Sequence, residues 1–563
     1  MKIKHFFGLA VIAAMTASCS SNNDLVNGGN GSSEVENGTA YASFKINLPT
    51  TSGTRAVPEG TPGFNEGTAA EYEVKNGTIL IFDATTDKFV TSADLGTMNP
   101  WTDVKADGVT TAAIATVKLS NVSVTGNYNA LVLLNNNTAD EATKKVTLPT
   151  NADTYATWSK DASKANATNY VSTDGIFMAN APMYSATSEP TTLVKINHVC
   201  ASPEEAQAKA ATTIYVERGL AKVTMKDFEK DGYLIGNGTT YAGDTVKIEK
   251  WQLDVTNNST YPVHQIGGLS TGFADIWKTA RFFDGTNTVF KRVYWGVDPN
   301  YDNSDYQTLA NCKTAFNMIT NDKVTGVAGE ANPQYCLENT FDLDNMKQGQ
   351  TTRVVFKAVF IPKGFKSKYK TFYKIGNNTT IWSQENLEKQ IKAKAQEVLG
   401  KESETNKIEV DLKAAGNNIE GNAGTKILTE ANVQHNGANV ASKEINAINE
   451  KLGLKAATET DPIVGIATYK DGESYYIARI KHFNEMTPWK AGEVYDSKNE
   501  KYLGRYGVLR NNWYELSVNK VSGLGYPDVP EVKPTLPDDE NDQYINVSVK
   551  ILSWAKRSQK IDL

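Results

Sequence analysis

The sequence predicts a mainly β protein made of antiparallel β-sandwich domains, with a few short helices. Short runs rich in Val, Ile, Leu, Phe and Tyr recur through the body of the chain, and loops rich in Asn, Gly, Thr and Asp separate them. These runs do not alternate with long helical patterns, as the repeating units of a parallel α/β sheet would. The clearest runs are 78–82, 130–134, 352–360, 463–469 and 513–518.

Composition bounds the number of domains and argues against several functions. The chain has 563 residues, with 58 Lys and Arg against 64 Asp and Glu, so its formal charge is −6. This length suits about two to four domains. A dispersed negative charge does not suit a nucleic-acid backbone, which needs clustered basic residues. With five His, four Cys and no zinc-type spacing, we predict no metal, no cofactor and no nucleic-acid partner.

The N-terminus has the features of an export signal. Two lysines precede an apolar stretch, 6–17, that is too short to span a bilayer. Small residues then lead to Cys19, and a polar tether follows. This order is typical of a bacterial lipoprotein signal, so we predict a signal peptide over 1–18 and a lipid such as palmitate on Cys19. An ordinary signal peptide with an incidental Cys is the alternative.

The first predicted strand, 40–48, is followed by a loop that a protease could reach. Alternation along the strand places four apolar residues on one face, namely Ala42, Phe44, Ile46 and Leu48. The loop holds Arg55, the only Arg before Arg218 in a chain with nine. The Arg55–Ala56 bond suits a trypsin-like protease, because the loop is flexible by composition and no Pro follows. Cleavage there would remove a lipid-anchored propeptide, 19–55, together with the strand.

The C-terminal end repeats the design of this strand. Segment 527–543 holds four of the chain's 18 Pro and favours an extended, stiff linker. The predicted strand after it has four apolar residues on one face, Ile545, Val547, Val549 and Ile551, and Asn, Ser and Lys on the other. We therefore expect a strand, within 544–563, that the linker holds away from its own domain.

Helices are predicted at three places. A capping box at 202–205, with Pro at the first helical position, opens a short helix to about 210. We place the main domain boundary there, giving domains over 56–210 and 211–526. Apolar spacing predicts further helices over 384–399 and about 445–452, each ended by a Gly. Both lie in 384–455, which we predict to be a surface insertion.

The two end strands could substitute for each other. If the first strand left its sheet, a hydrophobic groove with unpaired strand edges would remain, and such an edge recruits another strand. A C-terminal strand from a second copy would fit it. Each subunit would then donate one strand and accept one, a head-to-tail contact that builds filaments. The alternative is that both strands are ordinary parts of one sandwich.

Several of these segments resemble the fimbrillin family of Bacteroidetes type V pili, most closely the subunits of the minor (short) fimbrium. The resemblance covers the signal, first strand and Arg55 loop at one end and the Pro-rich linker and last strand at the other. Interior stretches that carry it are 216–223, 510–514 and 520–525, and the tail that carries it is 549–554 with 561–563. It implies two transthyretin-like β-sandwich domains and an extended C-terminal donor strand.

The resemblance also implies a function. The precursor would be lipid-anchored to the outer membrane, an Arg-specific surface protease would cut after Arg55, and 545–554 would be the donor strand. The presence of both a cleavable leader and a donor strand favours a shaft subunit of a cell-surface fimbrium. Its partners would be copies of itself and accessory anchor and tip subunits, and the fimbrium would support adhesion to host or bacterial ligands and biofilm formation.

Other functions find less support in the residues. The chain has no P-loop, no GxSxG, no HExxH and no Rossmann fingerprint, so we predict that it is not an enzyme. The rival function is a surface glycan-binding lipoprotein, in which Trp382, Trp489 or Trp513 would stack on sugars, although most Trp in sandwiches belong to the core. For Cys312 and Cys336, one disulfide and two separate buried thiols both remain open.

Overall fold

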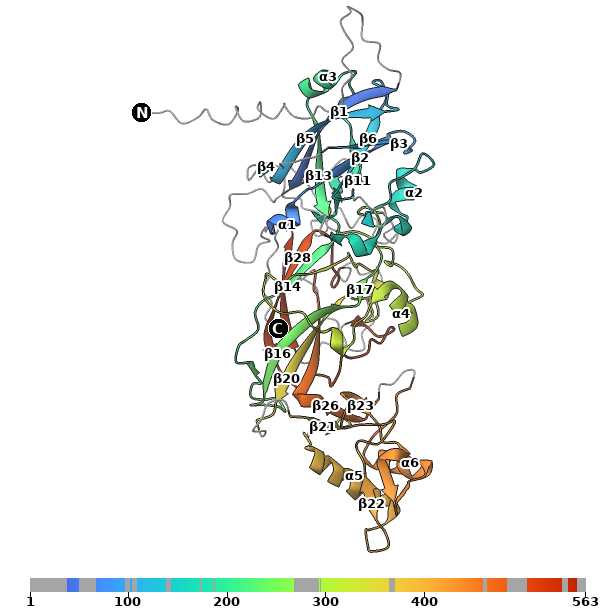
Figure 1. Ribbon diagram of the computed structural model, residues 1–563, viewed down its shortest axis with the longest axis vertical. Coiled ribbons are helices and arrows are strands. Elements are labelled where there is room, and N and C mark those ends of the chain that lie inside the picture. Colours follow the sequence, from blue (N-terminus) through green and yellow to red (C-terminus); the bar gives the residue numbers. More distant parts are fainter. Residues whose placement is uncertain are drawn as a thin grey trace, which may run out of the picture.

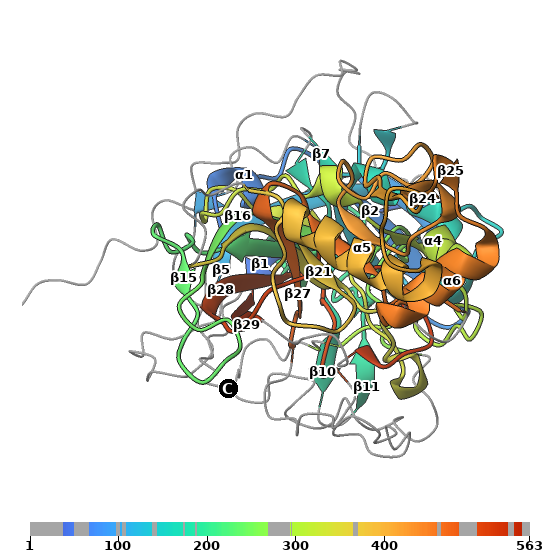
Figure 2. The same cartoon turned by 90° about the horizontal axis from the view of Figure 1, so that it is seen from below.

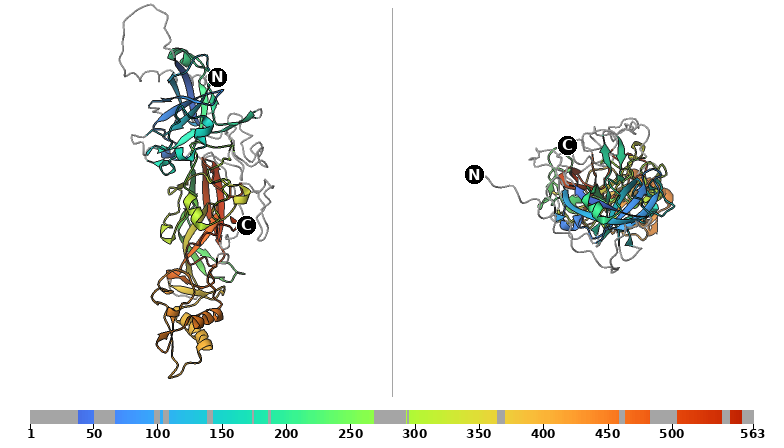
Figure 3. Two further views of the ribbon diagram at one scale, coloured as in Figure 1. Left: turned by 90° about the vertical axis from the view of Figure 1, so that its right-hand side faces the viewer. Right: turned by 90° about the horizontal axis from the view of Figure 1, so that it is seen from above.

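We describe the protein from a computed structural model. Three parts follow one another along an elongated molecule: a first domain, a second domain and a smaller distal module (Figures 1 and 3). The predicted mainly β fold is confirmed, with short helices between many strands. The structure describes residues 38–49, 67–96, 102–103, 109–137, 143–172, 175–185, 188–267, 293, 295–363, 370–458, 463–482, 504–538 and 545–553.

The first domain is organised around a nine-stranded sheet. The order is β3-β2-β6-β9-β13-β1-β5-β4, with β12 beside β6. Inward side chains of β1 and β5 meet those of β2 and β6 in one core, so the sheet folds back on itself. Its strands are β1 (Thr39–Pro49), β2 (Gly77–Asp83), β3 (Phe89–Asp94), β4 (Thr102–Asp103), β5 (Val109–Ser120), β6 (Tyr128–Leu134), β9 (Met178–Asn180), β12 (Val194–Lys195) and β13 (Thr212–Arg218).

A second hydrophobic cluster covers the outer face of β2 and β6. In β2, Ile79 and Ile81 belong to the central core while Leu80 and Phe82 face this outer cluster, where Trp158 packs. Both faces of the strand are therefore buried. Short elements build this layer and the edges of the domain: α1 (Ala69–Tyr72), α2 (Tyr155–Ser159), α3 (Pro203–Ala208), β7 (Val171–Ser172), β8 (Gly175–Ile176), β10 (Met183–Ser185) and β11 (Ser188–Thr191).

The second domain is a sandwich of two four-stranded sheets. The sheet orders are β19-β14-β28-β29 and β15-β16-β20-β27, and both sheets contribute to one core around Trp251, Phe356 and Tyr514. The elements are β14 (Ala221–Met225), β15 (Tyr233–Leu234), β16 (Thr245–Asp254), β17 (Thr256–Asn257), α4 (Leu309–Ala315), β18 (Phe316–Asn317), β19 (Gln334–Cys336), β20 (Arg353–Ile361), β27 (Glu473–Arg479), β28 (Asn512–Val521) and β29 (Ile545–Ser553). We predicted antiparallel sheets, but two strand pairs are parallel: β1 with β13 and β14 with β28.

The domain boundary lies at Gly219–Leu220 rather than near 210. β13 belongs to the first domain, where it pairs with β1 and β9, and β14 begins the second domain after only two intervening residues. A Cβ at Gly219 would lie 2.8 Å from the ring of Tyr170, so only glycine fits this crossing. The predicted capped helix is α3; it starts after Ser202, whose side chain accepts from the Glu205 amide.

From its sequence we predicted that the distal module would be loop-like surface decoration. That prediction is wrong. The module's strands and helices share a hydrophobic core that includes Leu387, Ile391, Ile445 and Ile448. The helices, which lie across the end of the molecule in Figure 2, are α5 (Gln384–Leu399) and α6 (Ser442–Lys451). The strands are β21 (Phe372–Ile375), β22 (Ile408–Val410), β23 (Gly424–Lys426), β24 (Val433–His435), β25 (Ala438–Asn439) and β26 (Ile466–Tyr469).

Candidate functional site

β1, the strand that we predict to be removed, lies in the interior of its sheet. Its inward residues are at most 1% exposed: Ala40, Ala42, Phe44, Ile46 and Leu48. On one side it pairs antiparallel with β5 along its whole length, and on the other it pairs parallel with β13 from Phe44 to Asn47. Nearer its start, Tyr41 exchanges two backbone hydrogen bonds with Cys200. The predicted strand and its apolar face are confirmed; its removal is not tested by these contacts.

The outward face of β1 is polar and partly covered by α3. The Ser43 hydroxyl donates to the backbone carbonyl of Ala206 at 2.8 Å. It therefore accepts from the Thr116 hydroxyl on β5, also at 2.8 Å. Lys45 is exposed, whereas Asn47 is only 3% exposed and its Oδ1 has no hydrogen-bond partner among the described residues. The polar face therefore has one open position and two enclosed ones.

The C-terminal strand is present as predicted but lies against its own domain. β29 pairs antiparallel with β28 over Ile545–Ser553, at the edge of the sheet. The register places the four predicted apolar positions opposite Val521, Val518, Leu516 and Tyr514. The expectation of a strand held away from its domain is therefore wrong for this chain.

The Pro-rich segment explains this difference, because it is packed rather than free. The Arg353 guanidinium donates to the carbonyl of Pro530 at 2.7 Å, and Val532 is buried. At its end, Asp538 accepts from the Thr351 hydroxyl at 3.0 Å, and its carbonyl accepts from Arg479 at 2.9 Å. These contacts hold the segment against the second domain, so that β29 lies beside β28.

A cluster of buried charges joins the two domains beside this sheet. Glu71 of α1 accepts from Lys222 of β14 at 2.8 Å and from the Tyr335 hydroxyl at 2.6 Å. Burial alone would raise the pKa of Glu71, but the hydrogen bonds from Lys222 and Tyr335 hold that pKa below its usual value. Lys222 also lies over the Trp513 ring of β28, 3.7 Å from its centroid. One lysine thus connects the first domain to the strand that holds β29.

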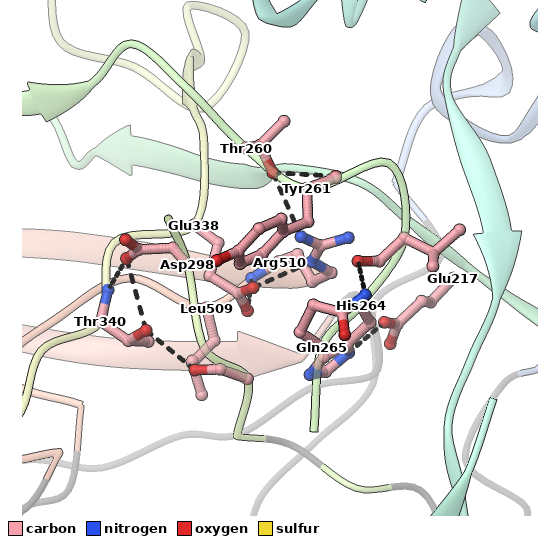
Figure 4. Close-up of polar contacts among 12 residues, drawn as sticks. Glu217, Thr260, Tyr261, His264, Gln265, Asp298, Glu338, Thr340, Leu509 and Arg510 are labelled. Carbon is pink, nitrogen blue, oxygen red and sulfur yellow. Dashed lines mark hydrogen bonds and ion pairs between the residues drawn. The ribbon is translucent and has the colours of Figure 1, made fainter. Parts of the chain in front are cut away.

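A second buried network crosses the same junction (Figure 4). Glu217 of β13 contacts His264 Nδ1 at 2.5 Å, and Arg510 contacts Glu338 at 3.1 Å. Asp298 accepts from the backbone amides of Thr340 and Asn300, and burial raises its pKa to about 7. Every one of these carboxyl groups is enclosed by protein, so the geometry suits a fixed connection between domains rather than chemistry on a substrate.

None of these junction residues was predicted individually from the sequence. Glu217, Lys222 and Arg510 lie inside the stretches 216–223 and 510–514 that carry the family resemblance, which was the available signal. Among the described residues, no group of three or more His, Cys, Asp and Glu is placed to hold a metal ion.

The other predicted residues are placed as follows. Cys200, Cys312 and Cys336 are buried free thiols, so the latter two do not pair; burial raises the pKa of Cys312 to about 11 and of Cys336 to about 12. Trp513 is 2% exposed and donates to Thr224 at 2.7 Å, so it does not face a sugar. Cys19, Arg55, Ala56 and Trp489 lie outside the described residues. Within the described part, we find no helix with the length and apolar character of a membrane span.

Comparison with known proteins gives this arrangement a family. The model of the family described as major fimbrial subunit protein type IV, fimbrillin, C-terminal, matches residues 467–560, from β26 through β29. In its C-terminal part the chain is similar to fimbrillins. The predicted fimbrillin relationship is thereby confirmed, and the match includes both β28 and β29. No curated protein matches the chain.

Two solved structures are similar to this chain at low identity. A putative cell adhesion protein from Parabacteroides distasonis is 12% identical, with a TM-score of 0.39, over 92% of this chain and 99% of that one. A fimbrial assembly protein from the same organism is 13% identical, with a TM-score of 0.24, over 56% of this chain and 95% of that one. The family assignment rests on the fimbrillin C-terminal match.

Proposed function

We propose that this protein is a structural shaft subunit of a cell-surface fimbrium. In this proposal it is exported as a lipoprotein lipidated on Cys19 and cut after Arg55 by an Arg-specific protease. The cut subunit loses β1, and β29 of another copy takes its place, so that subunits join head to tail. Accessory anchor and tip subunits complete the fimbrium, which serves adhesion and biofilm formation.

The position of β1 supports this proposal most directly. Because β1 lies between β5 and β13, its loss would leave two facing strand edges with unpaired backbone groups. Between those edges, the positions of its inward side chains, at most 1% exposed, would become an apolar groove. Burying four apolar side chains from another strand there contributes on the order of 6–12 kcal/mol as an upper estimate. The open groove therefore favours capture of a strand.

The position of β29 supports the same exchange from the other side. In its own chain, β29 has one strand neighbour, β28, and its other edge is the edge of the described sheet. In the place of β1 it would have two strand neighbours. Because each backbone N–H and C=O seeks a partner, moving from an edge to an interior position adds ladder hydrogen bonds. The donated strand thus gains a second strand neighbour in exchange for the single ladder with β28 that it gives up.

Cleavage is tested on filaments sheared from producing cells. We expect N-terminal sequencing to begin at Ala56 and denaturing gels run without boiling to show a ladder. Arg55→Ala and Arg55→Lys should both leave the chain uncut and monomeric, because an Arg-specific protease accepts neither residue. Thr54→Ala is the matched control and should assemble normally. Surface material that always begins at the lipid-bearing Cys19 would contradict the proposal.

Strand donation is tested by deleting 545–563. The deleted chain should be exported, cut and folded, because the core of the first domain does not include β29. It should not form filaments, although its open groove could still cap one end of a growing wild-type filament. Continued filament growth by the deletion variant alone would remove the donor role of β29.

A further inference from the structure

β1 and β29 carry similar short sequences. Residues 42–46 read Ala-Ser-Phe-Lys-Ile and residues 547–551 read Val-Ser-Val-Lys-Ile. The two segments are identical at Ser, Lys and Ile, and the remaining two positions are apolar in both. Their identical positions therefore fall on both faces of the strand, the polar residues on one and Ile on the other.

The environment of β1 gives each of these positions a different requirement. We call the space that β1 occupies between β5 and β13 the β1 slot. At Ser43, the slot offers the Ala206 carbonyl and the Thr116 hydroxyl, each 2.8 Å from the Ser43 hydroxyl. At Lys45 the slot opens to solvent, opposite Ile114, which is 63% exposed. At Ile46 it faces the central core.

We propose that β29 of a second copy enters the β1 slot in one register, with Ser548 at the position of Ser43 and Lys550 at the position of Lys45. This inference rests on the proposed function and specifies its partner contact. Ser548 would donate to the Ala206 carbonyl and accept from Thr116, and the Lys550 ammonium would remain in water. The strand would run in the direction of β1, antiparallel to β5 and parallel to β13.

The competing register places Ile545 at the position of Ala42, two residues away. It matches apolar side-chain sizes better at the core, but it moves Lys550 to the position of Asn47, which is 3% exposed. Among the described residues, no charged side chain is recorded in contact with Asn47, so a lysine there would lose its hydration without a counter-charge. The proposed register instead places Ile545 at Ala40, Val547 at Ala42 and Ser553 at Leu48, all buried positions. We take these packing costs to be smaller than the cost of a buried ammonium.

The proposed register also resolves the unsatisfied atom at Asn47. It brings Leu552 to this position, where the Asn47 Oδ1 is buried without a hydrogen-bond partner among the described residues. An apolar side chain removes that unpaired acceptor, and it also removes the hydrogen bond between the Asn47 side chain and Tyr215.

Disulfides between cysteines introduced into neighbouring subunits would identify the register directly. In wild-type β1, Ser43 lies opposite Thr116 on β5, while Lys45 lies opposite Ile114 and Tyr41 opposite Lys118. Directly opposite strand residues are close enough for a disulfide. We would combine Ser548→Cys with Thr116→Cys, Ile114→Cys or Lys118→Cys, shear the filaments from cells, oxidise them with diamide and run denaturing gels without reductant.

The proposed register predicts linkage with Thr116→Cys, at roughly ten times the yield of either single-cysteine variant. The linked ladder should survive boiling and collapse on reduction. A positive control is Ser43→Cys with Thr116→Cys in the uncut Arg55→Ala chain, which should form an internal bridge. The wild-type chain controls for its own cysteines, of which Cys200, Cys312 and Cys336 are buried.

The outcomes separate this inference from the function on which it rests. Filaments that link through Ile114→Cys or Lys118→Cys overturn the register and leave strand exchange standing. Filaments that link through none of the three positions overturn both the register and the use of the β1 slot by β29. If cut wild-type chains form no filament at all, the proposed function fails, and this inference fails with it.

Discussion

At the scale of residues, the junction between the two domains is held by charges that water does not reach. The side chains of Lys222 and Glu71 are 2% and 4% exposed, and those of Arg510 and Glu338 are 2% and 0% exposed. A buried charge without its partner costs several kcal/mol, so each member of a pair depends on the other. The two domains of the subunit are therefore expected to move as one body under load.

Glu71→Gln tests the first of these pairs. It removes the carboxylate that accepts from the buried Lys222 ammonium, so we expect the free energy of unfolding to fall by about 3 kcal/mol in a denaturant titration. Glu205→Gln is the matched control, because Glu205 pairs with Lys209 at a similar distance, 2.7 Å, in an exposed helix. The control should change little, since water and salt screen an exposed pair. Equal effects of the two substitutions would contradict the role of burial.

Asp298 gives the junction a dependence on pH. Burial raises its pKa to about 7 from the ordinary value of 3.8, so between these values the folded protein binds a proton that the unfolded chain has lost. The free energy of unfolding must then fall as pH rises through that window, by at most about 4 kcal/mol from this group. Above pH 7 this contribution is constant.

Asp298→Asn isolates that contribution. Unfolding midpoints of the wild type and the variant, measured from pH 4 to pH 8, should show the wild type losing stability relative to the variant up to about pH 7 and running parallel above it. The lowered pKa of Glu71 acts in the opposite direction, since it favours the folded state above the usual pKa of Glu, but it is common to both proteins and cancels in the difference.

At the scale of elements, the sequence was sufficient to predict those helices and strands in which apolar residues recur with a regular spacing. α5 begins and ends at the predicted residues, because its apolar residues recur at helical spacing and Gly400, with φ of 94°, ends it. The alternation in β1 and β29 likewise predicted two strands. The partner of β29 was not predictable, since alternation specifies a face but no neighbour, and the packing of the Pro-rich segment depends on Arg353 and Arg479, distant in sequence.

The buried junction was beyond prediction for a related reason. Glu71 and Lys222 are 151 positions apart, and Arg510 and Glu338 are 172 apart. Charged residues are mostly exposed in folded proteins, so the default expectation places all four on the surface. Only the fold brings them together.

Phe44→Ala distinguishes the uncut subunit from the filament. Phe44 is fully buried in β1, so the substitution should lower the stability of the uncut precursor by about 3–5 kcal/mol. Filaments assembled from the same variant should dissociate at the wild-type temperature, because in the proposed function the altered strand has left. The control, Ile214→Ala on β13, is also fully buried and should weaken both forms. Filaments weakened by Phe44→Ala would show that β1 stays.

At the scale of the whole molecule, the distal module is joined to the second domain through a pair of strands. β21 and β26 pair antiparallel, with Phe372 opposite Tyr469 and Ile375 opposite Ile466. Phe372 and Tyr469 stack at 4.7 Å in the core of the second domain, whereas Ile375 and Ile466 belong to the core of the module. The module is thus separable at a hairpin whose ends already lie together.

Replacing residues 377–464 by Asn-Gly should therefore give a shorter subunit that still folds and assembles. Asn-Gly suits a two-residue hairpin turn, and Ile375→Thr with Ile466→Thr removes the apolar surface that the excision would expose. We expect filaments whose denaturing ladder has steps smaller by the mass of the module. An insoluble or monomeric product would mean that assembly needs the module.

The interior position of β1 also limits how fast β1 could leave its sheet after cleavage. Breaking one peptide bond beyond Pro49 does not dissolve the ladders to β5 and β13, so a cut subunit keeps its first strand until another strand displaces it. On the β13 side the ladder covers only Phe44–Asn47, so the Leu48–Pro49 end, next to the predicted cut, is held by β5 alone among the described strands and is where we expect displacement to begin. In the proposed function, cleavage therefore prepares the subunit for exchange, and we expect filaments to grow at the rate at which donor strands of neighbouring copies reach that end.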